Sequence, residues 1–130
     1  MNLNFVPITE DNYRECIRLK VKEEQAKYVS DNNAYALAKA YVFRDESFPY
    51  AIYLGDLMIG FVLIRNREDL GNYAIEKIMI ARDYQGKGYG KEALSLIIRN
   101  MKKEKKFNKL CICCHVENVQ ALNLLRLAKV

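Results

Sequence analysis

The sequence predicts a mixed α/β (α+β) domain in which helices flank a central sheet. Three observations predict it. Residues 50–80 hold three runs of strand-forming residues, two helical patterns precede them, and the clearest amphipathic pattern of the chain lies between them and one more apolar run. The predicted order is β-α-α-β-β-β-α-β-α. The 130 residues, 51% hydrophobic and 28% charged, suit a single domain over residues 1–130 with its own core.

The first third of the chain predicts one strand and two helices. Residues 3–7 alternate as a short strand does, and residues 9–12 offer capping side chains for a first helix. A second helix is expected from Asn32 or Asn33 to Phe43. Its expected apolar stripe comprises Ala36, Leu37, Ala40 and Tyr41.

The middle of the chain predicts a hairpin and a further strand. Residues 50–54 and 57–65 flank the turn dipeptide Gly55-Asp56, and a loop is expected over residues 66–71. Residues 73–80 then predict a strand. Its period of two would place Glu76, Ile78 and Ile80 on one face.

The last third predicts a long helix, a strand and a final helix. The long helix has one continuous apolar stripe, formed by Gly90, Ala93, Leu94, Ile97, Ile98 and Met101. A strand is expected over residues 110–116, and the final helix from Asn118 to about Leu127.

A glycine-rich loop connects the strand at 73–80 to the long helix. Gly86, Gly88 and Gly90 let the backbone turn without side chains that block a ligand. Backbone amides at a helix N-terminus attract anions, and Lys87 and Lys91 add positive charge. The loop therefore predicts a phosphate site. The plainer interpretation is a helix start with glycines for tight packing.

Known phosphate-binding patterns narrow this prediction. The dinucleotide fingerprint needs G-x-G-x-x-G after a first strand, whereas this loop has the spacing G-x-G-x-G after a later strand. The P-loop needs Ser or Thr after its lysine, whereas Glu92 follows Lys91 here. The pattern Q-x-x-G-x-G is satisfied by Gln85, Gly88 and Gly90.

The formal net charge of +5 allows a polyanionic partner. Much of it comes from four lysines in residues 102–106, which also suit the solvated C-terminus of a helix. That block contains no aromatic residue before Phe107, so we expect no nucleic-acid partner.

Cysteine use predicts a reducing, cytoplasmic setting. Cys111, Cys113 and Cys114 share one predicted strand, on which they cannot all face one metal, so free thiols and no metal site are expected. No apolar run is long enough for a membrane span, and the first residues do not read as a signal peptide.

Residues 76–90 resemble the central strand, loop and helix start of the GNAT superfamily of acetyl-CoA-dependent N-acetyltransferases. Asn118, Ala121 and Leu124 resemble that family's N-x-x-A-x-x-L helix. The resemblance implies a mostly antiparallel central sheet flanked by helices, with acetyl-CoA as co-substrate.

The N-terminal half resembles one group of enzymes within this superfamily. Glu24-Gln25, Asn32 and the run at 36–38 are similar to bacterial spermine/spermidine acetyltransferases. This implies that a small amine, such as spermidine or spermine, accepts the acetyl group.

The resemblance implies roles for individual residues. The loop amides would hold the CoA pyrophosphate, the strand edge would pair with the pantetheine arm, and Asn118 would contact the cofactor from a neighbouring strand end. The cofactor-binding residues so implied are Ile78, Met79, Ile80, Gln85, Gly86, Lys87, Gly88, Tyr89, Gly90, Lys91 and Asn118.

Glu76 matches the carboxylate that takes the amine's proton in such enzymes, and an amide near Met79 would stabilise the oxyanion. The alternative for Glu76 is a strand glutamate paired with Lys77 or Arg82. Three acidic residues of the first helices could bind a polyamine, or could simply form a charged helix face. They are Glu23, Glu24 and Asp31.

The C-terminal residues depart from the family pattern. Leu125 stands where the family has the tyrosine that protonates the leaving thiolate, and Lys129-Val130 replace Gly-Phe. We therefore expect a member truncated before its final strands, which leaves open an acetyl-CoA-binding domain with little or no turnover. An unpaired edge at 110–116 would then favour a homodimer or higher oligomer.

Overall fold

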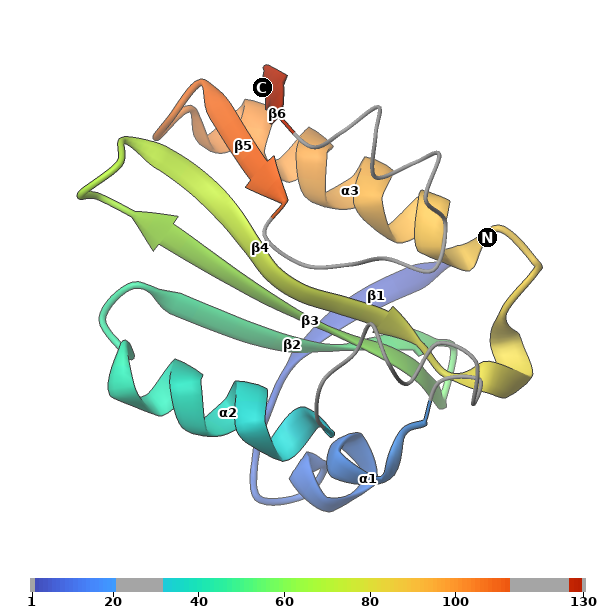
Figure 1. The fold of residues 1–130 in the computed structure, drawn as a ribbon. Helices are drawn as coiled ribbons and strands as arrows, with labels where there is room; N and C mark the ends of the chain where they lie inside the picture. Colours follow the sequence, from blue (N-terminus) through green and yellow to red (C-terminus); the bar gives the residue numbers. More distant parts are fainter. Residues whose placement is uncertain (1, 21–31, 113–126, 130) are drawn as a thin grey trace.

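The computed structural model describes residues 2–20, 32–112 and 127–129. Its elements are β1 (Leu3–Pro7), α1 (Tyr13–Arg18), α2 (Asn33–Val42), β2 (Ser47–Leu54), β3 (Leu57–Arg67), β4 (Asn72–Ile80), the 3₁₀ turn η2 (Arg82–Tyr84), α3 (Tyr89–Glu104), β5 (Lys109–Ile112) and β6 (Leu127–Lys129). The sheet has six strands in the order β1-β2-β3-β4-β5-β6. Helix α3 covers one face, and α1 and α2 cover the other (Figure 1).

The described strands confirm the predicted mixed, mostly antiparallel sheet. Strands β1 to β4 pair antiparallel in sequence order, and β5 pairs antiparallel with β6. Strand β5 is parallel to β4, and α3 makes the crossover that a parallel pair requires. In the part of the chain that the structure describes, β4 pairs with β5 only from Tyr73 to Ile75, so the pairing ends just before Glu76.

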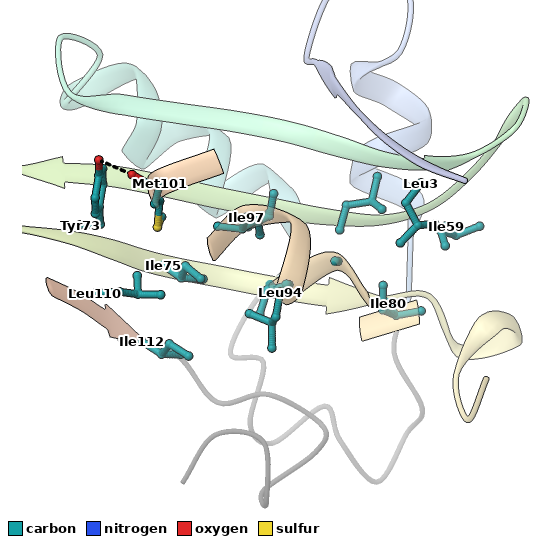
Figure 2. Packing of buried hydrophobic residues seen from close by; sticks show 14 residues of the cluster. Leu3, Ile59, Tyr73, Ile75, Ile80, Leu94, Ile97, Met101, Leu110 and Ile112 are labelled. Carbon is teal, nitrogen blue, oxygen red and sulfur yellow. Dashed lines mark hydrogen bonds between the residues drawn. The ribbon is translucent and has the colours of Figure 1, made fainter. Parts of the chain in front are cut away.

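Two hydrophobic clusters hold the layers together. Figure 2 shows the first, in which Leu94, Ile97 and Met101 of α3 pack on buried residues of β4 and β5. The second joins the helices on the opposite face to the sheet, with Cys16, Ala36, Ala40, Phe61 and Met79 among its members. The stripe predicted for α3 is confirmed, because its buried residues are Ala93, Leu94, Ile97 and Met101.

Helix α2 begins as predicted, and Ala36, Leu37 and Ala40 of its predicted apolar stripe pack in the cluster on the sheet. The side chain of Asn32 caps the helix by accepting a hydrogen bond from the Ala34 amide at 2.9 Å. Asn33 is buried, and its Nδ2 donates to the carbonyl oxygen of Cys16 at 2.8 Å, which ties α2 to α1. Tyr41, predicted in the apolar stripe, is 69% exposed. The buried stripe begins one turn earlier than predicted, at the polar residue Asn33, and ends at Ala40.

The C-terminal strand corrects two predictions. Residues 127–129 form β6, where the sequence predicted the end of a helix and no further strand. Because β6 pairs with β5 from Lys109 to Cys111, that part of β5 is not an open edge. At Leu110 and Cys111 this pairing removes the open edge on which the expected oligomer rested. The rest of the predicted final helix, residues 118–126, lies outside the described residues, as do residues 113–116 of the predicted strand.

Cys16 is a buried free thiol, and burial raises its pKa to about 11, so it stays protonated at neutral pH. Cys113 and Cys114 lie outside the described residues. Over residues 2–20 and 32–112, no group of three His, Cys, Asp or Glu side chains is arranged to hold a metal ion. None of the helices described is long and apolar enough to cross a membrane.

Gly60 permits the close approach of β3 and β4. A Cβ atom at this position would lie 2.5 Å from the carbonyl oxygen of Met79, a backbone atom that cannot rotate away. We therefore expect Gly60→Ala to lower the free energy of unfolding by about 1–3 kcal/mol, the usual cost of overpacking. Urea denaturation measures this loss. Unchanged stability would show that the two strands separate there without cost.

Tyr73 fastens the C-terminus of α3 to the sheet. Its hydroxyl donates to Glu104 Oε1 at 2.9 Å and accepts from the Lys106 amide at 3.0 Å. Its ring packs edge-on against Phe107. Figure 2 shows the same hydroxyl directed toward the carbonyl oxygen of Met101. Burial, followed by the bond to Glu104, raises the pKa of Tyr73 above its ordinary value of 10.0.

We expect Tyr73→Phe to lower the free energy of unfolding by about 1–2 kcal/mol, because the Lys106 amide loses its acceptor. Since the folded-state pKa is raised, this contribution is fully present below pH 10.0 and is lost as the pH rises toward the folded-state pKa. Urea denaturation at neutral and alkaline pH measures both effects. A difference between wild type and variant that stays constant at alkaline pH would contradict the assigned role of the hydroxyl.

Candidate active site

A β-bulge at Glu76 sets the geometry of the site. Leu63 of β3 pairs with Lys77 and the next residue, Ile64, pairs with Ile75, so Glu76 is an extra residue in β4. The bulge changes which side chains share a face. Ile78 packs in the cluster beneath α3, whereas Glu76 contacts Lys39 of α2. The prediction that Glu76 and Ile78 share a face is therefore wrong, because strict alternation holds only in a regular strand.

Both carboxylate oxygens of Glu76 accept a hydrogen bond from a cation. Its Oε1 lies 3.2 Å from Nη1 of Arg65, and its Oε2 lies 3.3 Å from Nζ of Lys39. The Glu76 side chain is 9% exposed. Of the partners expected for a plain structural glutamate, Arg82 pairs instead with its neighbour Asp83.

Arg65 is the fixed member of this group. Its Nε donates to Glu46 Oε2 at 2.6 Å, and its guanidinium lies 3.8 Å from the centre of the Phe43 ring. A stacked arginine with two carboxylate partners has little freedom to move. We call Lys39, Glu46, Arg65 and Glu76 the Glu76 cluster; its two positive and two negative charges balance.

The glycine loop has the backbone that its sequence predicts. Gly86 and Gly88 have φ values of +78° and +86°, in the left-handed region that favours glycine. Gly88 is the N-cap of α3, so the amides of Tyr89, Gly90 and Lys91 have no acceptor within the helix itself; the first intrahelical bond runs from the Glu92 amide to the Gly88 carbonyl oxygen. The 16 residues of α3 align their dipoles with the positive end at this loop.

Other contacts fix the loop to the end of β4. Gln85 Nε2 donates to the carbonyl oxygen of Ile80 at 2.8 Å, and the Gln85 amide closes a turn onto Arg82. Gln85 Oε1 is buried without a hydrogen-bond partner among the described residues. The Arg82 amide donates to the carbonyl oxygen of Lys20 at 2.7 Å, which joins the loop to the segment after α1. The side chain of Gln85 thus supports the loop from inside.

The other predicted site residues divide into two groups. Ile78, Met79 and Ile80 are buried on alternate faces of β4, so only their backbone edge is offered to a ligand. The structure brings this edge and the glycine loop together at one end of β4. Four predicted residues, and the position of the missing tyrosine, lie outside the described residues: Glu23, Glu24, Asp31, Asn118 and Leu125.

Sequence reasoning missed three members of the Glu76 cluster. Lys39 and Arg65 follow no motif that links them to Glu76. A signal existed for Glu46, because the two-residue turn at 55–56 alone would pair residue 46 with Arg65; a β-bulge between Ile52 and Tyr53 shifts the observed pair by one residue, to Ser47 and Arg65. That register places the residue before Ser47 beside Arg65.

A separate cavity of about 490 Å³ lies on the α3 side of the sheet, between β1, β2 and the helix. Phe5, Tyr50, Tyr73, Asn100 and Glu104 are among its lining residues. It contains neither Glu76 nor the glycine loop, so it is not part of the candidate active site.

Comparisons with known proteins agree with this arrangement. A family model described as "Acetyltransferase (GNAT) domain" matches residues 2–128. The spermine/spermidine N(1)-acetyltransferase of Bacillus subtilis strain 168 is 23% identical over 132 residues, which cover 95% of this chain and 84% of the relative.

Two solved structures share the fold. One is an acetyltransferase from Thermus thermophilus, with a TM-score of 0.71 and 15% identity, covering 95% of this chain and 83% of that one. The other is the spermidine N-acetyltransferase of Vibrio cholerae in complex with CoA and spermine. Its TM-score is 0.70 at 16% identity, and the match covers 94% of this chain and 76% of that one. The fold is thus shared with proteins that differ widely in sequence.

Proposed function

The chain belongs to the GNAT family of acetyltransferases, and on that premise we propose that it transfers the acetyl group of acetyl-CoA to a primary amine, a polyamine such as spermidine or spermine. It is an acyltransferase by family. The observation that carries the proposal is a buried carboxylate, Glu76, at a bulge of β4, the strand that leads into the glycine loop.

The glycine loop suits the phosphates of acetyl-CoA. The N-terminus of α3 supplies amides and a positive dipole end, and Lys87 and Lys91 add charge. A Cβ atom at Gly86 would meet no described atom within 4 Å, so the loop surface there is open to a ligand. We assign the pyrophosphate to the amides of Gly86, Lys87, Gly88, Tyr89, Gly90 and Lys91.

The edge of β4 suits the pantetheine arm. Pairing with β5 ends at Ile75 in the described residues, and the side chains of Ile78, Met79 and Ile80 are buried. An extended ligand with amide groups can therefore pair with this edge as an added strand does. Asn118 is assigned to the same cofactor from the family resemblance alone.

Glu76 is the proposed base. A polyamine ammonium has a pKa near that of lysine, about 10, so it must lose a proton before it attacks. That proton passes to the Glu76 carboxylate, directly or through water. The amine nitrogen forms the new bond to the acetyl carbon, the carbon–sulfur bond breaks, and a proton from the nitrogen converts the leaving thiolate to CoA thiol. A backbone amide near Met79 stabilises the negative charge that develops on the acetyl oxygen.

Polyamine as the acceptor is supported by the two relatives whose names carry spermine or spermidine, one of them solved with spermine. The Glu76 cluster is balanced in charge, so it does not by itself attract a ligand with several positive charges. The additional negative charge is assigned to Glu23, Glu24 and Asp31.

A panel of amines tests the acceptor class. Acetyl-CoA is mixed with spermidine, spermine, a lysine ester or an aromatic amine, and CoA thiol is followed with a thiol reagent. We expect kcat/KM to be highest for spermidine or spermine. A higher value for the aromatic amine would refute the polyamine assignment. Binding of acetyl-CoA with no thiol release for any amine would instead support a domain without turnover, the outcome that Leu125 in place of tyrosine suggests.

A further inference from the structure

We propose that Lys39 occupies the binding position of the acceptor's ammonium group in the free protein, and that the acceptor displaces it. Lys39 is then a residue that determines affinity and specificity for the acceptor. This inference rests on the proposed function of Glu76 and extends it. It follows from the unequal way in which the two cations of the Glu76 cluster are held.

Arg65 cannot be displaced easily. Its side chain is 11% exposed and contacts two carboxylates and the Phe43 ring. A planar guanidinium held by several partners is organised before any ligand arrives. Arg65 therefore stays on Oε1 of Glu76 and keeps the carboxylate in position.

Lys39 is held much more loosely. Its side chain is 37% exposed, against 9% for Glu76, and its contact with the cluster is the single 3.3 Å bond from Nζ to Oε2. Partly exposed lysine–carboxylate pairs contribute little free energy, because the flexible side chain loses entropy and water competes. Lys39 is thus the member of the cluster that can move into solvent at small cost.

The Lys39 side chain and a polyamine acceptor carry the same charged group. Lys39 presents a primary ammonium on an aliphatic chain, as a polyamine does. Each ammonium is a compact positive charge that donates hydrogen bonds. An ammonium ligand that replaces Lys39 leaves Glu76 with two cations, as before. An uncharged ligand would leave Oε2 without its counter-ion. The exchange therefore favours cationic acceptors over neutral ones.

The test compares three variants. Lys39→Met removes the charge and keeps an unbranched stem, whereas Lys39→Arg keeps a cation at the position. Lys103→Met is the matched control, because it makes the same change in net charge at an exposed position near the end of α3. We expect Lys39→Met to lower KM for spermidine about two- to fivefold, since it removes a competitor held by a weak ion pair.

In the same experiment kcat and the Kd for acetyl-CoA should stay within about twofold of wild type. Lys39→Arg should keep KM at or above the wild-type value, and Lys103→Met should leave it unchanged. A higher KM in Lys39→Met, with a lower melting temperature, would show that Lys39 only supports α2. An unchanged KM, or an equal fall in the control, would also overturn the inference.

The failure of the proposed function would be recognised separately. If wild type releases no CoA thiol with any amine, the proposed function fails. Calorimetric titration with spermidine then decides the inference by itself, because Lys39→Met should bind spermidine more tightly than wild type. Equal or weaker binding by Lys39→Met would overturn it.

Discussion

Glu76→Gln is expected to lower kcat/KM for the acceptor amine by about 10²-fold or more, the usual effect of losing a general base. Glutamine has nearly the shape of glutamate and can still accept a hydrogen bond from Arg65 or Lys39. It cannot take a proton from an ammonium ion. The loss should therefore appear in the transfer step, while the rise in melting temperature caused by acetyl-CoA stays at the wild-type value.

Glu46→Gln is the matched control for this variant. Glu46 also pairs with Arg65, at 2.6 Å, but it precedes β2 and does not lie on β4. A general electrostatic disturbance of the cluster would affect both variants alike. If Glu76→Gln keeps wild-type kcat/KM, or if Glu46→Gln loses as much, Glu76 is not the base.

Gly88→Val is expected to abolish the thermal stabilisation by acetyl-CoA. Gly88 has a φ of +86° at the N-cap of α3, a conformation that a β-branched residue adopts only under strain. Its side chain would also stand where the proposed phosphate approaches the amides. The melting temperature with and without acetyl-CoA measures the effect directly.

Backbone strain alone will lower the melting temperature of Gly88→Val, so a control with similar strain is needed. Gly71 has a φ of +69° in the turn between β3 and β4, and a Cβ atom there meets no described atom within 4 Å. Gly71→Val should lose stability but keep its full response to acetyl-CoA. Loss of the response in both variants, or in neither, would remove the loop from the proposed binding site.

Local patterns in the sequence were sufficient for most elements of the fold. The turn dipeptide at 55–56 set the hairpin, and the 3.6-residue stripe of α3 correctly identified the side chains that pack under Tyr73 and Ile75. These predictions succeed because neighbouring residues alone decide them.

The parts that sequence could not predict depend on contacts between distant segments. The bulge at Glu76 is visible only in the pairing of β4 with β3, and it reverses the face on which the carboxylate lies. The ion pairs of Glu76 join α2, β3 and β4, and no spacing in the sequence connects them. The strand at 127–129 likewise forms by pairing with β5, against a local pattern that continued the predicted helix.

The most direct test of the central claim is to measure CoA thiol and acetylated amine together after wild-type protein is mixed with acetyl-CoA and spermidine. The account predicts that both products appear in equal amounts, at a rate that depends on the spermidine concentration and falls about 10²-fold in Glu76→Gln. Protein that is stabilised by acetyl-CoA and yet forms no acetylated amine with any acceptor would contradict it.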